Sequence, residues 1–219
     1  MADQLHHPPV TSVTPDWLRH RFASGASAEE FLASLPDTGA RIAELESLVD
    51  VDPAGSPFAR LDRDMNVLAI VEGWCRDSQD GTAVLLRLVR SGASRCTVRF
   101  FLRSENPDLM AAYRKDGRYD SIPVLLFLDA EGNEIGRYIE RPDEVTAIYQ
   151  RHRAELAERH PEFAPADAAP KSFPEPVRDR LRAEMLALRE RDRRTTNGYI
   201  ITALEALAGR VASPIGSAT

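Results

Sequence analysis

The clearest hydrophobic pattern is a short, unbroken apolar run at residues 67–71, Val-Leu-Ala-Ile-Val, which is typical of a buried β-strand. Apolar residues then recur at helical spacing over 83–89. The pattern predicts a strand that turns into a helix close to Cys75, with the helix ending at about Arg90. A strand followed at once by a helix is the organising unit of the chain.

Further apolar segments continue this unit in an alternating order. They predict a strand at 96–102, a short helix at 107–113, a strand at 124–128, a strand at 135–139 and a helix at 143–159. A strand-helix-strand connection is parallel and right-handed, and the turn residues at 129–134 indicate an antiparallel hairpin. The predicted fold class is therefore α/β, with a central four-stranded mixed sheet flanked by helices.

Helical segments are also expected at both ends of the chain. Three amphipathic helices are predicted before residue 50. Thr14 and Ser27 are expected to cap the first two, and Asp37 is expected to cap the third. Five prolines at 161–176 predict an extended connector, followed by a helical hairpin with a break at 195–198. The expected domains are an N-terminal helical extension at 1–60, a central domain at 61–160, and the connector with a C-terminal helical hairpin at 161–219.

Composition and charge narrow the classes of partner. The 219 residues carry a formal net charge of −6 at pH 7, without a long basic block, so neither nucleic acid nor an anionic membrane surface is an expected partner. The apolar runs are too short to span a bilayer, and the N-terminus has no apolar signal segment. A cytoplasmic location is the expectation.

The two cysteines, Cys75 and Cys96, are too few for a disulfide framework and fit a reducing compartment. No group of cysteines and histidines has metal-ligand spacing, so neither a metal nor another cofactor is predicted. Cys75 should lie at the carboxyl end of one strand and Cys96 at the amino end of the next, with a helix of roughly 20 Å between them. A disulfide needs Cα atoms within about 7 Å, so we expect Cys96 to be a buried apolar residue rather than a resolving thiol.

Cys75 is the candidate nucleophile. The unpaired N–H groups and the dipole of a helix start favour a thiolate, and cysteines so placed can have pKa values of roughly 3.5 to 7.5 instead of about 8.5. About 45 residues later, Ile122-Pro123 opens an apolar strand. A proline fits a strand entry because it cannot donate a ladder hydrogen bond there, and X-Pro is the common context of a cis peptide bond.

This order of elements resembles the thioredoxin fold over residues 61–160. Trp74-Cys75-Arg76-Asp77-Ser78 occupies the place of the thioredoxin active-site motif, and Ser121-Ile122-Pro123 looks like its cis-proline loop. With Arg141-Pro142 after the hairpin, the chain is similar to bacterial thioredoxin-like proteins of the thioredoxin-9 type. The resemblance implies a thioredoxin-like fold with N- and C-terminal helical extensions, and a redox function.

Three departures from the family pattern bear on mechanism. Ser78 stands where a dithiol thioredoxin has its resolving cysteine, so Cys75 cannot close a disulfide within the motif. Ala69 replaces the buried aspartate of the classical fold, and Ala83 lies near the place of its kinking proline. The missing thiol and the missing aspartate together indicate a one-thiol mechanism or no redox role.

The leading hypothesis is a monothiol exchange in which Cys75 attacks a mixed disulfide of a client protein or a low-molecular-weight thiol, and an external thiol releases it. The expected catalytic residues are Cys75, Ser78 and Pro123, and the expected substrate-binding residues are Trp74, Arg76, Asp77 and Ile122. Ser78 would hydrogen-bond the thiolate and Trp74 would wall the site. Arg76 would favour the thiolate and Asp77 would oppose it.

The proline loop completes this hypothesis. A cis Pro123 would turn the backbone groups of Ile122 toward the sulfur and offer them to an extended substrate segment. Glu72 and Tyr119 are expected to line the same groove.

Two other functions are compatible with these residues. The chain could be a redox-inactive binding module that uses the cis-proline groove, because fold does not fix function. It could also react with peroxide through a sulfenic acid at Cys75. The dependence of alkylation rate on pH separates these hypotheses, since a pKa of the Cys75 thiol well below about 8.5 favours exchange or peroxide chemistry. The client, the reducing partner and the oligomeric state are not predicted.

Overall fold

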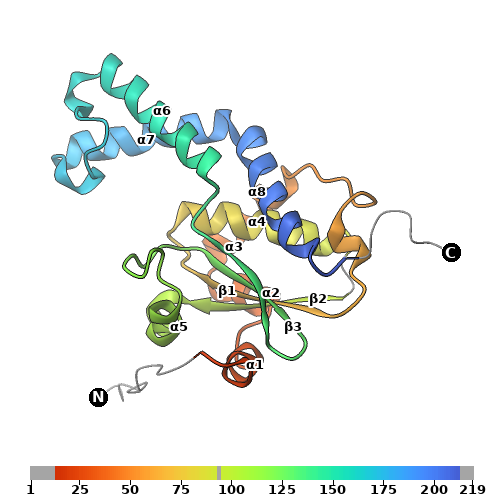
Figure 1. Ribbon diagram of the computed structural model, residues 1–219. Helices are drawn as coiled ribbons and strands as arrows, with labels where there is room; N and C mark the ends of the chain where they lie inside the picture. Colours follow the sequence, from red (N-terminus) through yellow and green to blue (C-terminus); the bar gives the residue numbers. More distant parts are fainter. Residues whose placement is uncertain (1–12, 93–94, 213–219) are drawn as a thin grey trace. The chain divides into compact units, whose positions relative to one another are not determined.

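A computed structural model describes residues 13–92 and 95–212, and its elements are drawn in Figure 1. The ends of the first and last predicted domains therefore lie outside the described residues. By its internal contacts the chain forms two compact units, one that runs to Glu140 and resumes at Ile201, and one at 141–200. The predicted domain boundaries are not tested by this division and stay a prediction.

The first unit is built on a four-stranded sheet with the strand order β2-β1-β3-β4. β1 pairs with β2 in parallel and with β3 in antiparallel, and β3 pairs with β4 in antiparallel. The strands are β1 (Met65–Val71), β2 (Cys96–Leu102), β3 (Val124–Asp129) and β4 (Glu134–Ile139). The predicted mixed sheet of four strands is confirmed.

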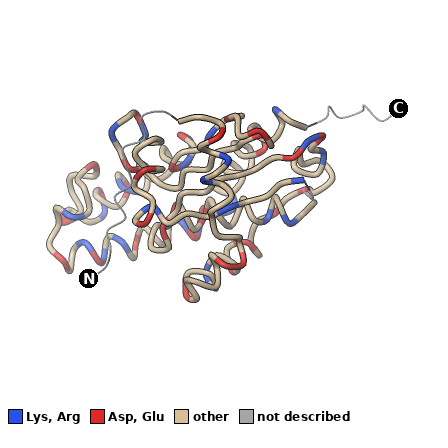
Figure 2. Tube along the Cα trace, turned by 90° about the horizontal axis from the view of Figure 1, so that it is seen from below, with Lys and Arg blue, Asp and Glu red and all other residues tan. Residues whose placement is uncertain are grey.

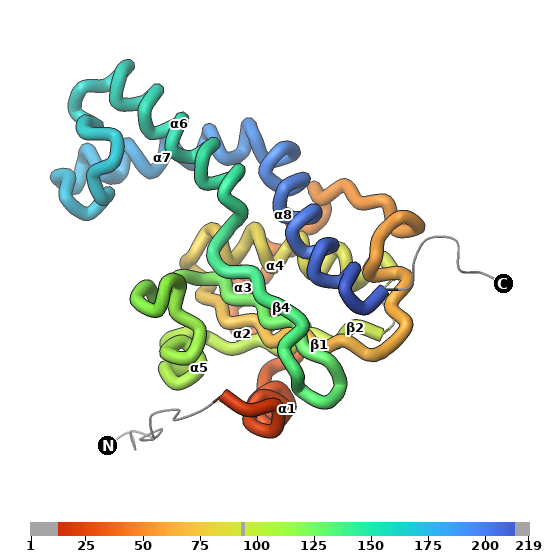
Figure 3. The backbone as a smooth tube through the Cα atoms, in the orientation of Figure 1, coloured from red at the N-terminus to blue at the C-terminus, as the bar shows by residue number. Residues whose placement is uncertain are grey.

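Helices cover both faces of this sheet (Figures 1 and 3). The helices of the first unit are α1 (Pro15–Ala23), α2 (Ala28–Ser34), α3 (Pro36–Ser47), α4 (Arg76–Arg90) and α5 (Pro107–Ala112), with 3₁₀ turns η1 (Pro57–Arg60) and η2 (Arg103–Glu105). Two of the predicted caps are present, because the Thr14 hydroxyl accepts from the Trp17 N–H and Ser27 forms a reciprocal capping box with Glu30. The expectation that Asp37 caps the third helix is wrong, because α3 begins at Pro36 and Asp37 lies in its first turn.

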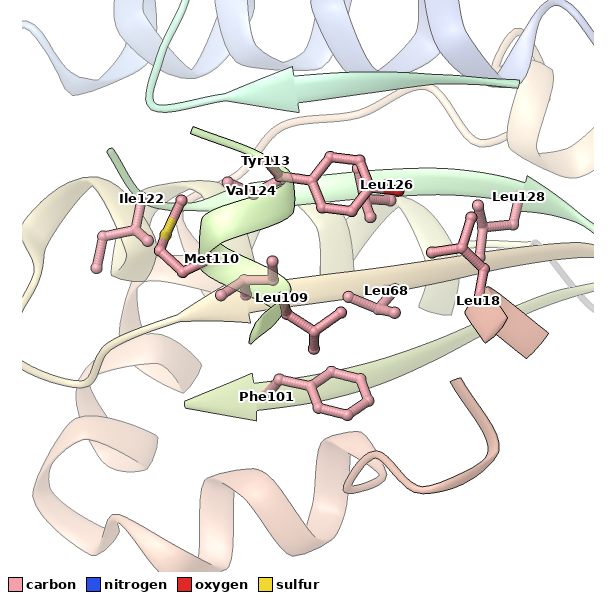
Figure 4. Close-up of a cluster of buried hydrophobic side chains, with 11 residues drawn as sticks. Leu18, Leu68, Phe101, Leu109, Met110, Tyr113, Ile122, Val124, Leu126 and Leu128 are labelled. Carbon is pink, nitrogen blue, oxygen red and sulfur yellow. The ribbon is translucent and has the colours of Figure 1, made fainter. Parts of the chain in front are cut away.

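The core has two layers because successive strand residues point to opposite faces. On one face, Leu68 and Phe101 pack with Leu18 of α1 and Leu109 of α5 (Figure 4). On the other face, the Phe31 ring of α2 stacks on Phe100 at 4.5 Å between centroids. Covering both faces explains why β1 reads as a continuous apolar run in the sequence.

The last part of α8 (Arg193–Ala208) also packs on the sheet of the first unit. A Cβ atom at Gly136 of β4 would lie 2.7 Å from a methyl carbon of Leu207. The Arg210 guanidinium donates to the Ile135 carbonyl at 2.7 Å. The sequence near the C-terminus therefore supplies the helix that approaches β4, and glycine at position 136 leaves the room for it.

The second unit contains the remaining helices, α6 (Asp143–Arg159), α7 (Glu175–Arg191) and the start of α8, with η3 (Pro161–Phe163) and η4 (Pro170–Ser172) between α6 and α7. The prediction of an extended connector is wrong. Phe163 is buried with Leu156 of α6 and with Leu181 and Leu188 of α7. The prolines therefore shape compact turns around a small apolar core.

The predicted helix break at 195–198 is also wrong, because the helices meet at Asp192 instead. Hydrogen bonds from Arg191, and then from His152, hold the pKa of the Asp192 carboxyl down at about 2. Thr196 follows inside α8, where its hydroxyl donates to the Arg193 carbonyl at 3.1 Å. The break between α7 and α8 therefore lies at Asp192, whose carboxylate is stabilised by side-chain hydrogen bonds. One of these joins Asp192 to His152, 40 positions earlier in the chain.

The described residues contain neither a helix that could span a membrane nor a group of side chains that could hold a metal ion. No helix within 13–92 or 95–212 is both long and apolar enough to cross a membrane. Nor do three or more His, Cys, Asp or Glu side chains in those ranges come together as a metal site would require.

Candidate active site

Cys75 is the N-cap residue of α4, at the end of a short turn that follows β1. Its own N–H donates to the Glu72 carbonyl at 3.1 Å, and its carbonyl accepts from the Gln79 N–H at 3.0 Å. The backbone is extended at Cys75 and helical from Arg76 onward, as the switch from strand to helix predicts. The partly buried Cys75 also contacts the apolar cluster on the α1 and α5 face of the sheet.

The proline loop lies directly beside this thiol. The Ile122–Pro123 peptide bond is cis, and the Cys75 Sγ atom is 3.7 Å from the Ile122 carbonyl oxygen, so the thiol donates a hydrogen bond to it. A Cβ atom at Gly81 of α4 would lie 3.2 Å from the Pro123 ring. The structure therefore brings together three of the predicted site residues, Cys75, Ile122 and Pro123, which come from two distant segments.

The Ser78 hydroxyl has a different partner from the one expected. Its buried hydroxyl oxygen accepts from the Glu72 N–H at 3.4 Å, and so ties the first turn of α4 back to the end of β1. The Glu72 carboxylate accepts from the Ser104 N–H at 2.7 Å. Glu72 is buried, so the expectation that it lines an open groove is wrong; it instead supports the loop after β2. A hydrogen bond from Ser78 to the thiolate stays a prediction.

Two side chains that sequence analysis missed fix the turn before Cys75. The Gln79 amide nitrogen donates to the Gly73 carbonyl at 2.6 Å, and the Thr38 hydroxyl of α3 donates to the same carbonyl at 3.3 Å. The Gln79 amide oxygen accepts from Arg76 at 3.0 Å. Gln79 therefore bonds to residues on both sides of Cys75, and α3 packs directly on this turn. A polar residue on the otherwise apolar face of α4 was the only signal for Gln79.

Trp74 is the most exposed aromatic residue beside the thiol, with 67% of its surface accessible. The Arg103 guanidinium lies over its ring, 5.4 Å from the ring centroid. Arg103 also donates to the Asp120 carbonyl at 3.3 Å, in the segment that leads into the proline loop. Arg103 therefore connects the two sides of the site, and no sequence pattern predicted this contact. Tyr119 is exposed, with Arg118 over its ring at 5.1 Å.

Arg76 and Asp77 occupy the first turn of α4, where the sequence placed them. The Arg76 side chain is exposed and Asp77 is partly buried. An acidic residue in a first turn is favourable to the helix because it faces the positive end of the dipole. The same charge opposes a nearby thiolate, so this end of α4 combines one favourable and one unfavourable side chain.

Cys96 lies at the other end of the parallel strands. It is the first residue of β2 and pairs with Met65, the first residue of β1, so the two cysteines are at opposite ends of the sheet, as predicted. Burial raises the pKa of the Cys96 thiol to about 12. Cys96 is therefore protonated at neutral pH and is a poor nucleophile.

This arrangement can attack a sulfur, and it offers a carbonyl and an exposed ring beside the point of attack. Cys75 supplies the thiol and the Ile122 backbone accepts a hydrogen bond next to it. Trp74 and Arg103 form one exposed wall.

Comparisons with known proteins bear on the family and the fold. The thioredoxin-9 family model, described as thioredoxin, matches residues 25–155. A search of curated proteins found no match. Among solved structures, a protein of unknown function from Pseudomonas aeruginosa is 18% identical over 90% of this chain and 97% of its own, with a TM-score of 0.57. An HIV epitope scaffold is 17% identical over 89% and 97% of the two chains, with a TM-score of 0.55.

At these identities the two structures show the fold alone, whereas the family match covers more than half of the sequence. It includes α2 and α3 as well as the strand, thiol and proline loop. The chain belongs to the thioredoxin family, in its thioredoxin-9 group.

Proposed function

We propose that the protein is a monothiol exchange protein whose Cys75 reacts with mixed disulfides of small thiols or client proteins. The observation that carries the proposal is the position of the Cys75 sulfur, at the start of α4 and 3.7 Å from the Ile122 carbonyl. A thiol at this place can be reached by an extended segment that adds its backbone beside Ile122.

The exchange takes two steps, and each conserves the number of disulfides. The Cys75 thiolate attacks one sulfur of the mixed disulfide, a new bond to Cys75 forms, and the other sulfur leaves as a thiolate that takes a proton from water. An external thiol then attacks the adduct as its thiolate, and Cys75 leaves as a thiolate. Ser78 carries no sulfur, so the second step needs this external thiol.

The neighbouring residues have defined roles in this proposal. The Trp74 ring borders the path by which a substrate reaches the Cys75 sulfur, and the Ile122 backbone aligns the substrate. Arg76 favours the attacking thiolate by its charge, and Asp77 moderates that effect. Ser78 and Gln79 keep the first turn of α4 in place against the end of β1 and the turn before Cys75. Cys96, whose thiol pKa is raised to about 12, takes no part.

The test is release of a small thiol from a peptide mixed disulfide, with glutathione as the external thiol. The wild-type protein and Cys96→Ser should accelerate release equally, and Cys75→Ser should give only the uncatalysed rate. Release that survives in Cys75→Ser would overturn the proposal. Tight binding of the peptide without release by the wild-type protein would favour the redox-inactive binding module instead. Reaction of Cys75 with peroxide but with no disulfide would favour the sulfenic acid chemistry.

A further inference from the structure

Arg103 is placed between the two segments that form the site. Its guanidinium lies over the Trp74 ring on one side, and on the other it donates to the Asp120 carbonyl, two residues before Ile122. Two residues span at most about 7 Å of chain. Because Cys75 follows Trp74 directly, and its sulfur contacts Ile122, the guanidinium is within the reach of a group attached to that sulfur.

Arg103 differs from many arginines of the same unit in its partners. Acidic and basic residues are both scattered along the trace (Figure 2). The arginines of the first unit that form salt bridges with carboxylates are Arg19, Arg21, Arg41, Arg90, Arg95, Arg114 and Arg137. Within 13–92 and 95–212, no carboxylate lies at salt-bridge distance from Arg103.

Two carboxylates close to Arg103 in the fold are engaged elsewhere. Asp120 offers Arg103 its main-chain carbonyl, while its carboxylate accepts from Arg114 at 2.7 Å. The Glu72 carboxylate accepts from the Ser104 N–H. The chain as a whole has a net charge of −6. Arg103 therefore places a positive charge, without an acidic partner, beside the candidate nucleophile of an acidic protein.

The guanidinium carbon of Arg103 lies 5.4 Å from the centroid of the Trp74 ring. A guanidinium in contact with an aromatic ring keeps N–H donors available, and two of them match a carboxylate in two parallel hydrogen bonds. Only one of the two terminal nitrogens of Arg103 donates to Asp120. Arg76, next to Cys75, adds a second positive charge, and Asp77 subtracts from it on the α4 side.

We infer that Arg103 determines substrate specificity. The molecule whose sulfur becomes bonded to Cys75 also carries a carboxylate, and Arg103 binds that carboxylate. The inference rests on the proposed exchange at Cys75 and goes beyond it by naming the chemistry of the adduct. The carboxylate belongs either to an acidic residue next to the cysteine of a client protein or to a small carboxylate-bearing thiol.

The experiment uses 2-pyridyl disulfides, which release pyridine-2-thione when Cys75 attacks, so the second-order rate is read by absorbance. One arm compares cysteine peptides that differ only by Glu, Gln or Lys beside the cysteine. The other arm compares the adducts of glutathione and of 2-mercaptoethanol, the second of which has no carboxylate. The variants are Arg103→Gln and Arg103→Lys, with Arg95→Gln as the control, because Arg95 pairs with Asp64 at the far end of the sheet.

The wild-type protein and Arg95→Gln should react about five- to tenfold faster with the carboxylate member of a pair than with its neutral member. Arg103→Gln should bring this ratio close to one, whatever it does to the absolute rates, Arg103→Lys should keep part of it, and added salt should reduce it. A preference in the peptide arm alone identifies a protein client, and a preference in the small-thiol arm alone identifies a small thiol. Both results support the inference.

Equal wild-type rates for charged and neutral substrates would overturn the inference, and so would a preference that persists in Arg103→Gln. Either result leaves the proposed exchange intact, because pyridine-2-thione is still released. The exchange itself fails only if the wild-type protein releases it from none of the substrates. Thermal unfolding of each variant checks that the fold is kept, and the Arg103→Lys ratio remains informative if Arg103→Gln does not fold.

Discussion

The two cysteines lie at opposite ends of the same pair of parallel strands, and although both side chains are partly buried, their neighbours differ. Cys75 follows the carboxyl end of β1, where the chain turns into α4 and meets the proline loop. Cys96 opens β2 beside the first residue of β1, and its burial raises the pKa of its thiol to about 12. The carboxyl ends of strands in a strand-helix-strand unit lead into helix starts and loops, and reactive groups gather there.

Position in the fold, and not residue type, therefore distinguishes the thiol that we propose to react from the one that we expect to be inert. At the Cys75 end, the sulfur belongs to the N-cap residue of a helix and lies 3.7 Å from the Ile122 carbonyl oxygen of the cis-proline loop. At the Cys96 end, the backbone belongs to a β-strand and is paired with β1. Changes at the first end should therefore alter chemistry, while changes at the second should alter stability alone.

The largest expected effect is the difference in alkylation between the two thiols. With a pKa of about 12, Cys96 is a thiolate in only about one molecule in ten thousand at pH 8, against roughly a quarter for an ordinary cysteine with a pKa of about 8.5. Iodoacetamide should therefore modify Cys96 in the native protein about a thousandfold more slowly than an ordinary exposed thiol, and Cys75 should react first. Peptide mapping over time measures this, with the denatured chain as control. Equal alkylation rates of Cys75 and Cys96 in the native protein would contradict this difference between the two thiols.

A smaller effect is expected from Gln79→Leu. The change removes the 2.6 Å hydrogen bond to the Gly73 carbonyl and the acceptor for Arg76, so the turn that carries Cys75 loses its strongest support. We expect exchange about three- to tenfold slower and a loss of about 1 to 3 kcal/mol in the free energy of unfolding. Kinetics with a 2-pyridyl disulfide and denaturant unfolding measure the two quantities.

Gln79→Glu is the matched variant for this prediction. A carboxylate can still accept from Arg76 but cannot donate to the Gly73 carbonyl while it is ionised. Exchange should therefore fall in both variants if the bond to Gly73 positions the thiol. Wild-type kinetics in Gln79→Glu would show that this bond does not matter for the chemistry.

The smallest effect is expected from Thr38→Val, which keeps the shape of the side chain but removes its hydroxyl. The 3.3 Å bond from α3 to the Gly73 carbonyl is long, and Gln79 still donates to the same oxygen. We expect about 0.5 to 1 kcal/mol of lost stability and less than a twofold change in exchange. Thr38→Ser should behave as the wild-type protein. A loss of exchange as large as that of Gln79→Leu would place α3 in the chemistry of the site.

The sequence predicted the order of elements and the two motifs because these depend on local patterns. The apolar run of β1, the helical spacing after Cys75 and the Ile-Pro strand entry are each set by neighbouring residues. The opposite placement of Cys75 and Cys96 followed from the handedness of one connection. These are the features that the structure confirms.

Long-range partners were not predictable in the same way. Amphipathic spacing shows which face of a helix is buried, but not what covers it. The helix at 143–159 is present as predicted, yet it belongs to the second unit, and Leu207 near the end of the chain approaches β4 of the first. Arg103 and Thr38 were missed for the same reason, since their partners are 17 and 35 residues away.

The central claim is that Cys75 alone forms mixed disulfides. The most direct measurement is to incubate the native full chain with glutathione disulfide at neutral pH, quench with acid, and map the adducts by mass spectrometry. The account predicts one glutathione per chain, attached at Cys75. An adduct at Cys96, a bridge between Cys75 and Cys96, or an unmodified Cys75 would contradict it.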